Sequence, residues 1–268
     1  MDRYLEGRSA LITGSVQGIG MAVAKSLASA GARIGVHGLA TPQQAAEAVA
    51  AMKAAGAPEA KFFEGDVRKP DAIEAMMAAV AAWGGPDILV NNAGVQHTVS
   101  LADATRAIWD NVIAINLSAA FDTMRLALPG MAKRGYGRVV NIASVHGLVA
   151  SVNKAPYVAS KFGLVGMSKV AALEYAASGS RESGGVTINC ICPGFIETSL
   201  IEPQIMERAA KFGGDRAKGA ADLLSDKQPS KRTAMPEEIG ALALWLCHPV
   251  AHNVTGAAIP VDGGWTAQ

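Results

Sequence analysis

The sequence predicts one α/β domain built on a doubly wound parallel sheet, with helices on both faces of the sheet. Short apolar segments alternate with alanine-rich stretches of helical character along almost the whole chain. The apolar segments are continuous, which is typical of parallel strands buried on both faces. With 268 residues, half of them apolar, the chain can form one large domain, and no linker divides residues 1–268.

The N-terminal half alternates regularly between strands and helices. Gly31 ends the first helix, and Thr41 and Pro42 are a suitable N-cap and first residue for the second. The expected strands cover residues 9–13, 33–37, 61–65 and 87–91, and the expected helices cover residues 18–30, 41–55, 71–83 and 107–134.

The C-terminal half continues the alternation with one interruption. Strands are expected over residues 137–142, 186–191 and 257–261, and helices over residues 156–177 and 236–247. Residues 196–231 break the pattern, because they are rich in charge, glycine and short helical pieces. This insertion follows the C-terminal end of a strand, where ligands bind in open α/β sheets. We therefore predict a small helical substrate lid rather than a passive surface excursion.

The composition argues against several classes of protein. The chain has 24 basic and 23 acidic residues, so nothing in its charge favours nucleic acid or an anionic membrane as a partner. No apolar run is expected to reach the roughly 18 residues of a membrane helix, and the N-terminus does not resemble a signal peptide. We therefore expect a cytoplasmic protein. Three cysteines, Cys190, Cys192 and Cys247, do not suggest a disulfide framework, and the first two are expected on one side of a strand as core residues.

A glycine-rich turn follows the first expected strand. The segment TGSVQGIG at residues 13–20 places Gly14, Gly18 and Gly20 between a strand and a helix. A bound pyrophosphate requires close backbone approach, free N–H groups and the positive end of a helix dipole. The spacing is GxxxGxG, which differs from the GxGxxG of larger dinucleotide-binding enzymes. A tight turn alone would also use glycines, but the position after the first strand favours a dinucleotide site.

The second expected strand ends in VHGLAT at residues 36–41, where dinucleotide specificity is usually set. An acidic residue there would bind the adenosine ribose 2′-hydroxyl, and a basic residue would bind a 2′-phosphate. Gly38 and Leu39 provide neither, and Ser15, Val16 and Gln17 in the glycine-rich turn are also uncharged. Because a 2′-phosphate would lack a cation partner, the sequence favours NAD over NADP.

Four polar residues form a candidate catalytic set. Tyr157 and Lys161 are four residues apart on an expected helix and therefore share one face. A phenol has a pKa of about 10, and a nearby ammonium is expected to lower it and to favour the phenolate. Ser144 follows the fifth strand, where its hydroxyl can donate to a developing alkoxide or carbonyl oxygen. Asn116 lies inside an expected helix, which is unfavourable for asparagine, so it is either functional or makes a structural hydrogen bond.

The chain resembles the short-chain dehydrogenase/reductase family in TGSVQGIG, NNAG at residues 91–94, Asn116, Ser144, Tyr157, Lys161 and the PG pair at residues 193–194. The resemblance covers nearly the whole chain. It implies a Rossmann-type sheet and a subunit that forms dimers or tetramers, and we expect a homotetramer. It also implies that Tyr157 carries the proton and that Lys161 binds the nicotinamide ribose and tunes Tyr157. Ser144 would orient the substrate oxygen, and Asn116 would hold a water in a proton relay.

The same resemblance assigns a cofactor site along the C-terminal edge of the sheet. Thr198 matches the family residue that reaches the nicotinamide carboxamide, and no metal site is expected. The residues expected to bind NAD are Gly14, Ser15, Gln17, Gly18, Ile19, Leu39, Asp66, Val67, Asn92, Gly94, Tyr157, Lys161, Pro193, Gly194, Ile196 and Thr198.

Several segments resemble one branch of the family, the bacterial D-3-hydroxybutyrate dehydrogenases. These segments are NNAGVQHT at residues 91–98, IASVHGLVAS at 142–151, LLSDKQPS at 223–230 and DGGWTA at 262–267. The resemblance implies reversible, NAD-dependent oxidation of D-3-hydroxybutyrate to acetoacetate. A hydroxy acid needs donors for its carboxylate, and Lys154 is the expected cation. The residues expected to bind substrate are Gln96, Ser144, His146, Lys154, Tyr157, Phe195, Gln204 and Trp265.

Two departures from this branch keep alternatives open. Phe195 stands where the branch has tryptophan, and a smaller aromatic could admit a longer hydroxy acid. Residues 178–185 form a longer segment than expected, which we interpret as a surface loop far from the cofactor edge. A 3-oxoacyl thioester reductase that uses NADPH would need a basic 2′-phosphate site. A non-catalytic dinucleotide-binding protein would not need the intact set of Asn, Ser, Tyr and Lys.

Overall fold

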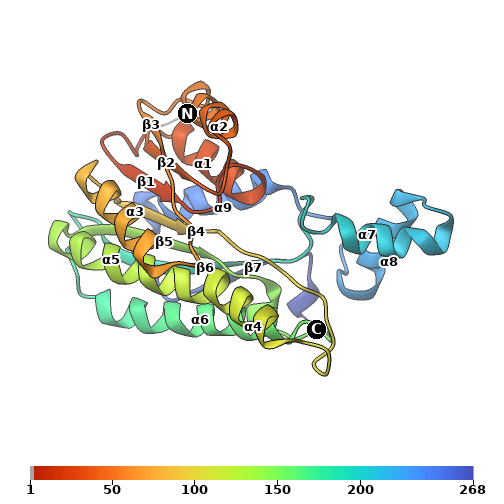
Figure 1. The fold of residues 1–268 in the computed structure, drawn as a ribbon. Coiled ribbons are helices and arrows are strands. Elements are labelled where there is room, and N and C mark those ends of the chain that lie inside the picture. The colour runs from red at the N-terminus through yellow and green to blue at the C-terminus, as the bar shows by residue number, and fades with distance from the viewer. Residues whose placement is uncertain (1–2, 268) are drawn as a thin grey trace.

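The strands form one parallel sheet in the order β3-β2-β1-β4-β5-β6-β7 in the computed structural model, which describes residues 3–267 (Figure 1). The chain runs outward from β1 on one side and from β4 on the other, so the strand order reverses between these two strands. Ligands bind at such a reversal in open α/β sheets. The predicted doubly wound parallel sheet is confirmed. The strands are β1 (Ser9–Ile12), β2 (Arg33–His37), β3 (Ala60–Phe63), β4 (Ile88–Asn91), β5 (Tyr136–Ile142), β6 (Gly185–Pro193) and β7 (Ala258–Val261).

Helices cover both faces of the sheet and explain the continuous apolar strands (Figure 1). Leu11 and Ile12 are neighbours on β1, are both fully buried, and belong to separate apolar clusters on the two faces. The cluster with Ile12 includes residues of α1 (Gly18–Ser29), α2 (Pro42–Ala54) and α9 (Pro236–Leu246). The cluster with Leu11 includes residues of α3 (Pro70–Ala82), α5 (Ala119–Arg134) and α6 (Ala155–Tyr175).

The long helix expected over residues 107–134 is interrupted, which corrects the sequence prediction. It consists of α4 (Arg106–Ile113), a π-helical turn (Ala114–Ser118) and α5. Asn116 lies in the π turn and is buried. A π turn shifts the backbone hydrogen-bond register by one residue, and such turns frequently occur at functional sites.

Residues 106–134 contain no unbroken apolar run of membrane length, because Asp110, Asn116 and Asp122 interrupt them. By length and overall composition alone, Arg106–Arg134 is nevertheless long and apolar enough to cross a membrane. Half of the apolar 18-residue stretch within this segment is buried in the protein, where α5 packs on α3 and α4 packs on α6. This packing accounts for the apolar composition, because core helices of globular domains pass the same test.

Most other local predictions agree with the structure. Thr41 caps α2, since its hydroxyl accepts from the Gln44 N–H at 3.3 Å and the Gln44 side chain accepts from the Thr41 N–H at 2.9 Å. Cys190 and Cys192 are free and lie in one apolar cluster beneath α6. The strand β6 is longer than expected and extends to Pro193.

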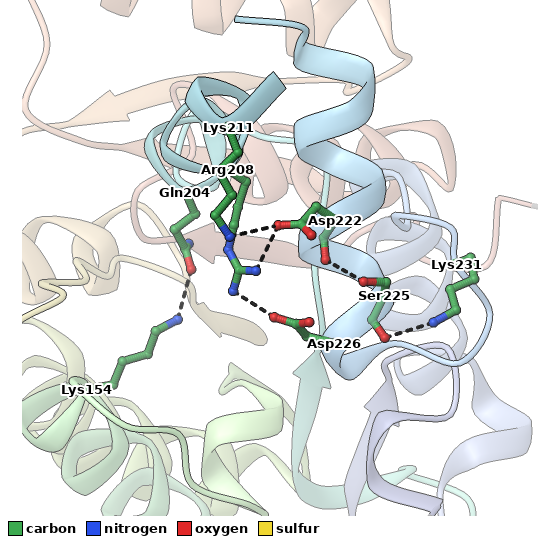
Figure 2. A network of polar contacts seen from close by, with 8 residues as sticks. All are labelled: Lys154, Gln204, Arg208, Lys211, Asp222, Ser225, Asp226 and Lys231. Atoms are coloured by element: carbon green, nitrogen blue, oxygen red, sulfur yellow. Dashed lines mark hydrogen bonds and ion pairs between the residues drawn. The ribbon is translucent and has the colours of Figure 1, made fainter. Parts of the chain in front are cut away.

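The insertion after β6 forms the predicted helical segment. Its helices α7 (Glu202–Ala209) and α8 (Arg216–Lys227) pack on one another and stand away from the sheet layers (Figure 1). Arg208 on α7 forms ion pairs with Asp222 and Asp226 on α8, at 2.9 and 2.7 Å (Figure 2). These contacts hold the two helices together as one unit.

Residues 178–185 precede the N-terminal end of β6, at the opposite end of the sheet from the ligand-binding edge. The Ser183 hydroxyl donates to the Gly135 carbonyl at 2.7 Å. The buried Arg138 guanidinium donates to the Gly184 and Gly185 carbonyls at 3.1 and 2.9 Å. The loop is therefore anchored on the side of the sheet that the sequence predicted.

Candidate active site

A cleft of about 710 Å³ follows the C-terminal ends of the strands and crosses the point where the strand order reverses. Its walls come from the turns after β1, β2, β3, β4, β5 and β6, and from the start of α6. Of the residues expected to bind the cofactor, those that line this cleft are Gly14, Gln17, Gly18, Ile19, Leu39, Asp66, Val67, Asn92, Gly94, Tyr157, Lys161, Pro193, Gly194, Ile196 and Thr198.

The glycine-rich turn fits a pyrophosphate. A Cβ atom on Gly20 would lie 2.4 Å from the Gly14 carbonyl oxygen, and Gly14 itself has a φ of +64°. Among the described residues, no side chain caps the N-terminus of α1, which begins at Gly18. The first N–H groups of this helix therefore remain available to an anion, together with the positive end of the helix dipole.

Ser15 differs from its expected role. Its side chain is fully buried below the turn, where the hydroxyl donates to the Ile12 carbonyl at 2.8 Å and accepts from the His37 N–H at 3.1 Å. Because both bonds stay within the protein, the side chain does not line the cleft. Ser15 contributes to the shape of the turn instead.

The end of the cleft beside β2 and β3, where the sequence predicts the adenosine, contains two residues that the sequence interpretation missed, His37 and Arg68. Arg68 donates to both carboxylate oxygens of Asp66, at 2.9 Å from Nε and 2.7 Å from Nη2. Hydrogen bonds from Arg68 hold the pKa of Asp66 down at about 2. Arg68 is therefore ion-paired with its neighbour, and Gly38 and Leu39 add no charge beside it. Asp66 and Arg68 are two positions apart just after a strand, and this spacing could have predicted their ion pair from the sequence.

Tyr157 and Ser144 lie together in the middle of the cleft. Burial raises the pKa of Tyr157, and a hydrogen bond with the Ser144 hydroxyl opposes this rise. Lys161 is buried too. Its ammonium lies 5.6 Å from the centre of the Tyr157 ring and donates to the Ile142 carbonyl at 2.8 Å. The sequence predicts that Lys161 lowers the pKa of Tyr157. In the structure this pKa is raised instead, because the effect of burial exceeds that of the hydrogen bond with Ser144.

Burial also affects the lysine of this pair. It lowers the pKa of Lys161 to about 8. A lysine with a pKa so close to neutrality can exchange a proton more readily than a solvated one. The arrangement places a titratable amine and a phenol in the same part of the cleft.

Asn116 makes structural hydrogen bonds from the π turn. Its side chain accepts from the Val95 N–H at 2.8 Å and donates to the Val95 carbonyl at 2.9 Å, so it fixes the segment after β4. It also donates to the Ser160 hydroxyl at 3.2 Å. The same residue lines a small enclosed cavity of about 10 Å³ that Lys161 also lines, and this is about the size needed for one water.

Apart from Ser144 and Tyr157, the expected substrate residues lie outside the cleft lining, where a loop contacts the helical insertion. Lys154 Nζ donates to Gln204 Oε1 on α7 at 3.1 Å, and the two side chains point toward one another (Figure 2). Gln96 is half-buried on the segment after β4, and the Val99 N–H on that segment donates to the Asn153 carbonyl at 2.8 Å. This bond draws the Gln96 segment against the turn that carries Lys154.

Four aromatic rings contact one another in series at this end. The Trp265 ring lies 5.1 Å from the Phe195 ring and 5.4 Å from the His146 ring, and His146 lies 6.0 Å from the Tyr157 ring. His146 Nδ1 is 3.3 Å from the Val149 carbonyl, which can only accept, so this contact requires the proton on Nδ1. Burial, with a smaller effect of Lys154, lowers the pKa of His146 to about 4, so its ring is neutral.

The fold and the cleft together define an oxidoreductase that binds a nicotinamide dinucleotide. The sequence pattern of the family described as short chain dehydrogenase matches residues 8–208. The chain belongs to the short-chain dehydrogenase family. The fold agrees, because the structure of an L-sorbose reductase from Gluconobacter frateurii, complexed with NADPH and L-sorbose, superposes with a TM-score of 0.91 at 30% identity and full coverage of both chains.

Two curated relatives are more similar in sequence. The D-beta-hydroxybutyrate dehydrogenase of Cupriavidus necator is 46% identical over 98% of this chain and 100% of its own length. The enzyme of the same name from Rhizobium meliloti is 43% identical over 97% of this chain and 99% of its own length.

Proposed function

We propose that this enzyme oxidises D-3-hydroxybutyrate to acetoacetate with NAD, in a reversible reaction. The observation that carries the proposal is the setting of Lys154, which is 9% exposed and bonded to the neutral amide of Gln204. Among the described residues, no carboxylate lies within ion-pair distance of Lys154. A buried ammonium without an acidic partner is costly, and the carboxylate of a small hydroxy acid would compensate it. The names of the two curated relatives agree with this substrate.

The reacting hydroxyl would bind between Ser144 and Tyr157. Tyr157 takes the hydroxyl proton as the carbonyl forms, and Ser144 donates to the oxygen that carries the developing charge. When bound, NAD would supply the acceptor for the hydride of C3 and a positive charge that favours the Tyr157 phenolate. Lys161 would hold the ribose beside it, and a water in the small cavity that Asn116 and Lys161 line would carry the proton onward from Lys161.

The carboxylate would lie against Lys154, with the amides of Gln96 and Gln204 as further donors. A neutral His146 with its proton on Nδ1 offers an acceptor at Nε2, so we assign it to the wall with Trp265 rather than to the donors. The methyl end of the substrate would face Phe195 and Trp265. Measuring the turnover of a longer hydroxy acid tests whether Phe195 leaves additional room at this end.

We propose NAD rather than NADP as the cofactor. The support is the adenosine end, where Arg68 is already paired with Asp66, the turn between β2 and α2 carries no charge, and Leu39 is 70% exposed. A 2′-phosphate beside Gly38 would meet no free cation from the turn between β2 and α2. The proposed contacts are those of the cleft-lining residues given above.

We propose that residues 1–268 act as one domain in which residues 196–231 close over the substrate. The ion pairs of Arg208 hold α7 and α8 together, so the lid would move as a unit and bring Gln204 to the carboxylate. Closure would exclude water from the reacting groups. The contact between Gln204 and Lys154 is the link through which substrate would stabilise the closed lid.

We also propose a homotetramer in the cytoplasm. Large apolar side chains on α4, α5 and α6 are solvent-exposed in the isolated subunit, and contact between subunits would cover them. Free, buried cysteines are consistent with a reducing compartment. Light scattering of the purified protein tests the assembly, and cell fractionation tests the location. The exposed side chains are Trp109, Phe121, Leu126, Phe162, Val170 and Leu173.

The proposal is tested by comparing two substrate and cofactor pairs. We expect turnover of D-3-hydroxybutyrate with NAD, and much weaker turnover of an acetoacetyl thioester with NADPH. The opposite result would assign the chain to thioester reduction. If the protein binds NADH and turns over neither substrate, the family assignment stands and the substrate proposal is wrong.

A further inference from the structure

His37 is a buried histidine between two turns of the dinucleotide cleft, and the catalytic proposal does not use it. It is the last residue of β2 and is 2% exposed. Its backbone carbonyl accepts from the Ser15 N–H at 2.8 Å. Its ring Nδ1 accepts from the Gly14 N–H at 3.2 Å, and its ring Nε2 lies 2.9 Å from the Gly65 carbonyl. The imidazole therefore links the glycine-rich turn after β1 to the segment after β3.

These two contacts require one protonation state. The Gly14 N–H can only donate and the Gly65 carbonyl can only accept, so the ring must be neutral with its proton on Nε2. A proton added at Nδ1 would place two N–H groups against one another and break the bond to Gly14. Burial lowers the pKa of His37 and so favours the neutral ring, while the Gly65 bond and Asp66 act in the opposite direction.

The glycine-rich turn cannot absorb a displacement of Gly14 easily. A Cβ atom on Gly14 would lie 3.0 Å from the Ala93 Cα, and one on Gly20 would lie 2.4 Å from the Gly14 carbonyl oxygen. The backbones of the turn and of the segment after β4 are therefore in close contact. A shift at Gly14 would move Gly20 and the N-terminus of α1, where the pyrophosphate is expected.

We infer that His37 is a positioning residue for the dinucleotide, and that its protonation weakens dinucleotide binding. The neutral imidazole sets the position of the glycine-rich turn through Gly14 and anchors it on Gly65. The charged groups at this end of the cleft are Asp66 and Arg68, which are paired with one another, and residues 13–20 carry no charge. The inference concerns the dinucleotide end alone, so it stands or fails independently of the hydroxy-acid substrate.

The experiment is a fluorescence titration of NADH binding from about pH 8 down to about pH 5 with the wild-type protein and three variants. The Kd of the wild type should rise by up to about tenfold per pH unit at the acid end, as expected for one linked proton. In His37→Asn, the amide oxygen replaces Nδ1 as an acceptor that does not titrate. Its Kd at pH 8 should stay within about threefold of the wild type and its pH dependence should flatten.

The other two variants separate positioning from stability. His37→Leu removes the acceptor and should raise the Kd at pH 8 by about tenfold, a loss of roughly 1.4 kcal/mol. His252→Asn changes a histidine that does not line the cleft, so its pH profile should match the wild type. Thermal unfolding of each variant at both ends of the pH range identifies any that fail to fold.

A second measurement does not depend on variants. Nitrogen chemical shifts of the His37 ring, followed against pH by NMR, should give a lower pKa with NADH bound than without it, because binding and deprotonation are linked. A Kd for NADH that does not change with pH, a His37→Asn variant that keeps the wild-type slope, or a His37 pKa unaffected by NADH would each overturn the inference.

Discussion

Lys154 and Gln204 are joined by a hydrogen bond of 3.1 Å between the turn before α6 and the lid helix α7. The bond ties the insertion of residues 196–231 to the segment that leads directly into Tyr157. Burial lowers the pKa of Lys154 to about 8, and its described surroundings supply no carboxylate. The pair holds one cation and one amide close together. These are groups that bind a carboxylate, and a substrate carboxylate would complete the site.

Removing the charge of Lys154 tests this interpretation. In Lys154→Met, we expect the KM for D-3-hydroxybutyrate to rise by roughly 10- to 100-fold, because a hydrogen bond to a charged group contributes about 1.5–3 kcal/mol. The Kd for NADH should be nearly unchanged. Steady-state kinetics and an NADH titration measure both quantities. The exposed Lys133, changed to Met, is the matched control, and an unchanged KM in Lys154→Met would mean that Lys154 does not bind substrate.

The same lysine predicts a pH dependence. Its ammonium is present below the pKa of about 8 and is lost as the pH rises through that value. The KM for D-3-hydroxybutyrate should therefore be lowest below pH 8 and increase above it. Lys154→Arg keeps its charge at these pH values, so its KM should stay level where that of the wild type increases. Parallel profiles for the two proteins would assign the pH dependence to another group.

Tyr157→Phe removes the proposed base and keeps the ring. We expect kcat to fall by about 10²–10⁴, which is the usual contribution of a positioned acid or base. NADH binding should remain, since the phenol hydroxyl bonds to Ser144 rather than to the glycine-rich turn. Single-turnover absorbance and NADH titration measure the two effects separately. Turnover close to that of the wild type would contradict the mechanism.

Leu39→Arg adds a cation at the adenosine end without burying it, because Leu39 is 70% exposed. We expect the ratio of kcat/KM for NADP to that for NAD to increase by about tenfold, as one charge-assisted bond to a 2′-phosphate would give. Initial rates with both cofactors measure the ratio. A wild-type enzyme that already prefers NADP would contradict the cofactor proposal at once.

Gly20→Ala tests the fit of the pyrophosphate site. Its Cβ would lie 2.4 Å from the Gly14 carbonyl oxygen, so the turn must shift, and we expect the Kd for NADH to rise by more than about tenfold. Gly130→Ala on α5 is the control, because its Cβ would meet only the far end of the Arg134 side chain at 3.2 Å. Equal NADH affinity in both variants would show that the turn does not hold the dinucleotide.

The features predicted from sequence are those that depend on local pattern. Leu11 and Ile12 are both apolar because adjacent residues of a buried strand face opposite helix layers. Consecutive apolar residues of this kind predict a parallel sheet that is covered on both faces. Gly14, Asn92, Ser144 and Gly194 come just after strand ends, so the strand pattern brings them to one edge, where the start of α6 adds Tyr157 and Lys161. The Rossmann-type fold and the membership of the family were therefore accessible from sequence.

The features that were missed depend on contacts between distant segments. The π turn at Asn116 is fixed by hydrogen bonds to Val95, which lies 21 residues away. The role of His37 depends on Gly14 and Gly65, which are 23 and 28 residues away. Hydrogen bonds between segments so far apart leave no periodic pattern in the sequence. The buried position of Ser15 was also hidden, because a serine in a phosphate-binding turn has the same local pattern whether it faces inward or outward.

The most direct test of the proposed activity is the absorbance of NADH formed from NAD by the purified enzyme, with D- and L-3-hydroxybutyrate supplied separately. We predict rapid turnover of the D enantiomer and turnover of the L enantiomer that is lower by at least about 100-fold, because one arrangement of carboxylate and hydroxyl satisfies both Lys154 and Tyr157. Equal rates with the two enantiomers, or no turnover of either by protein that binds NADH, would contradict this prediction.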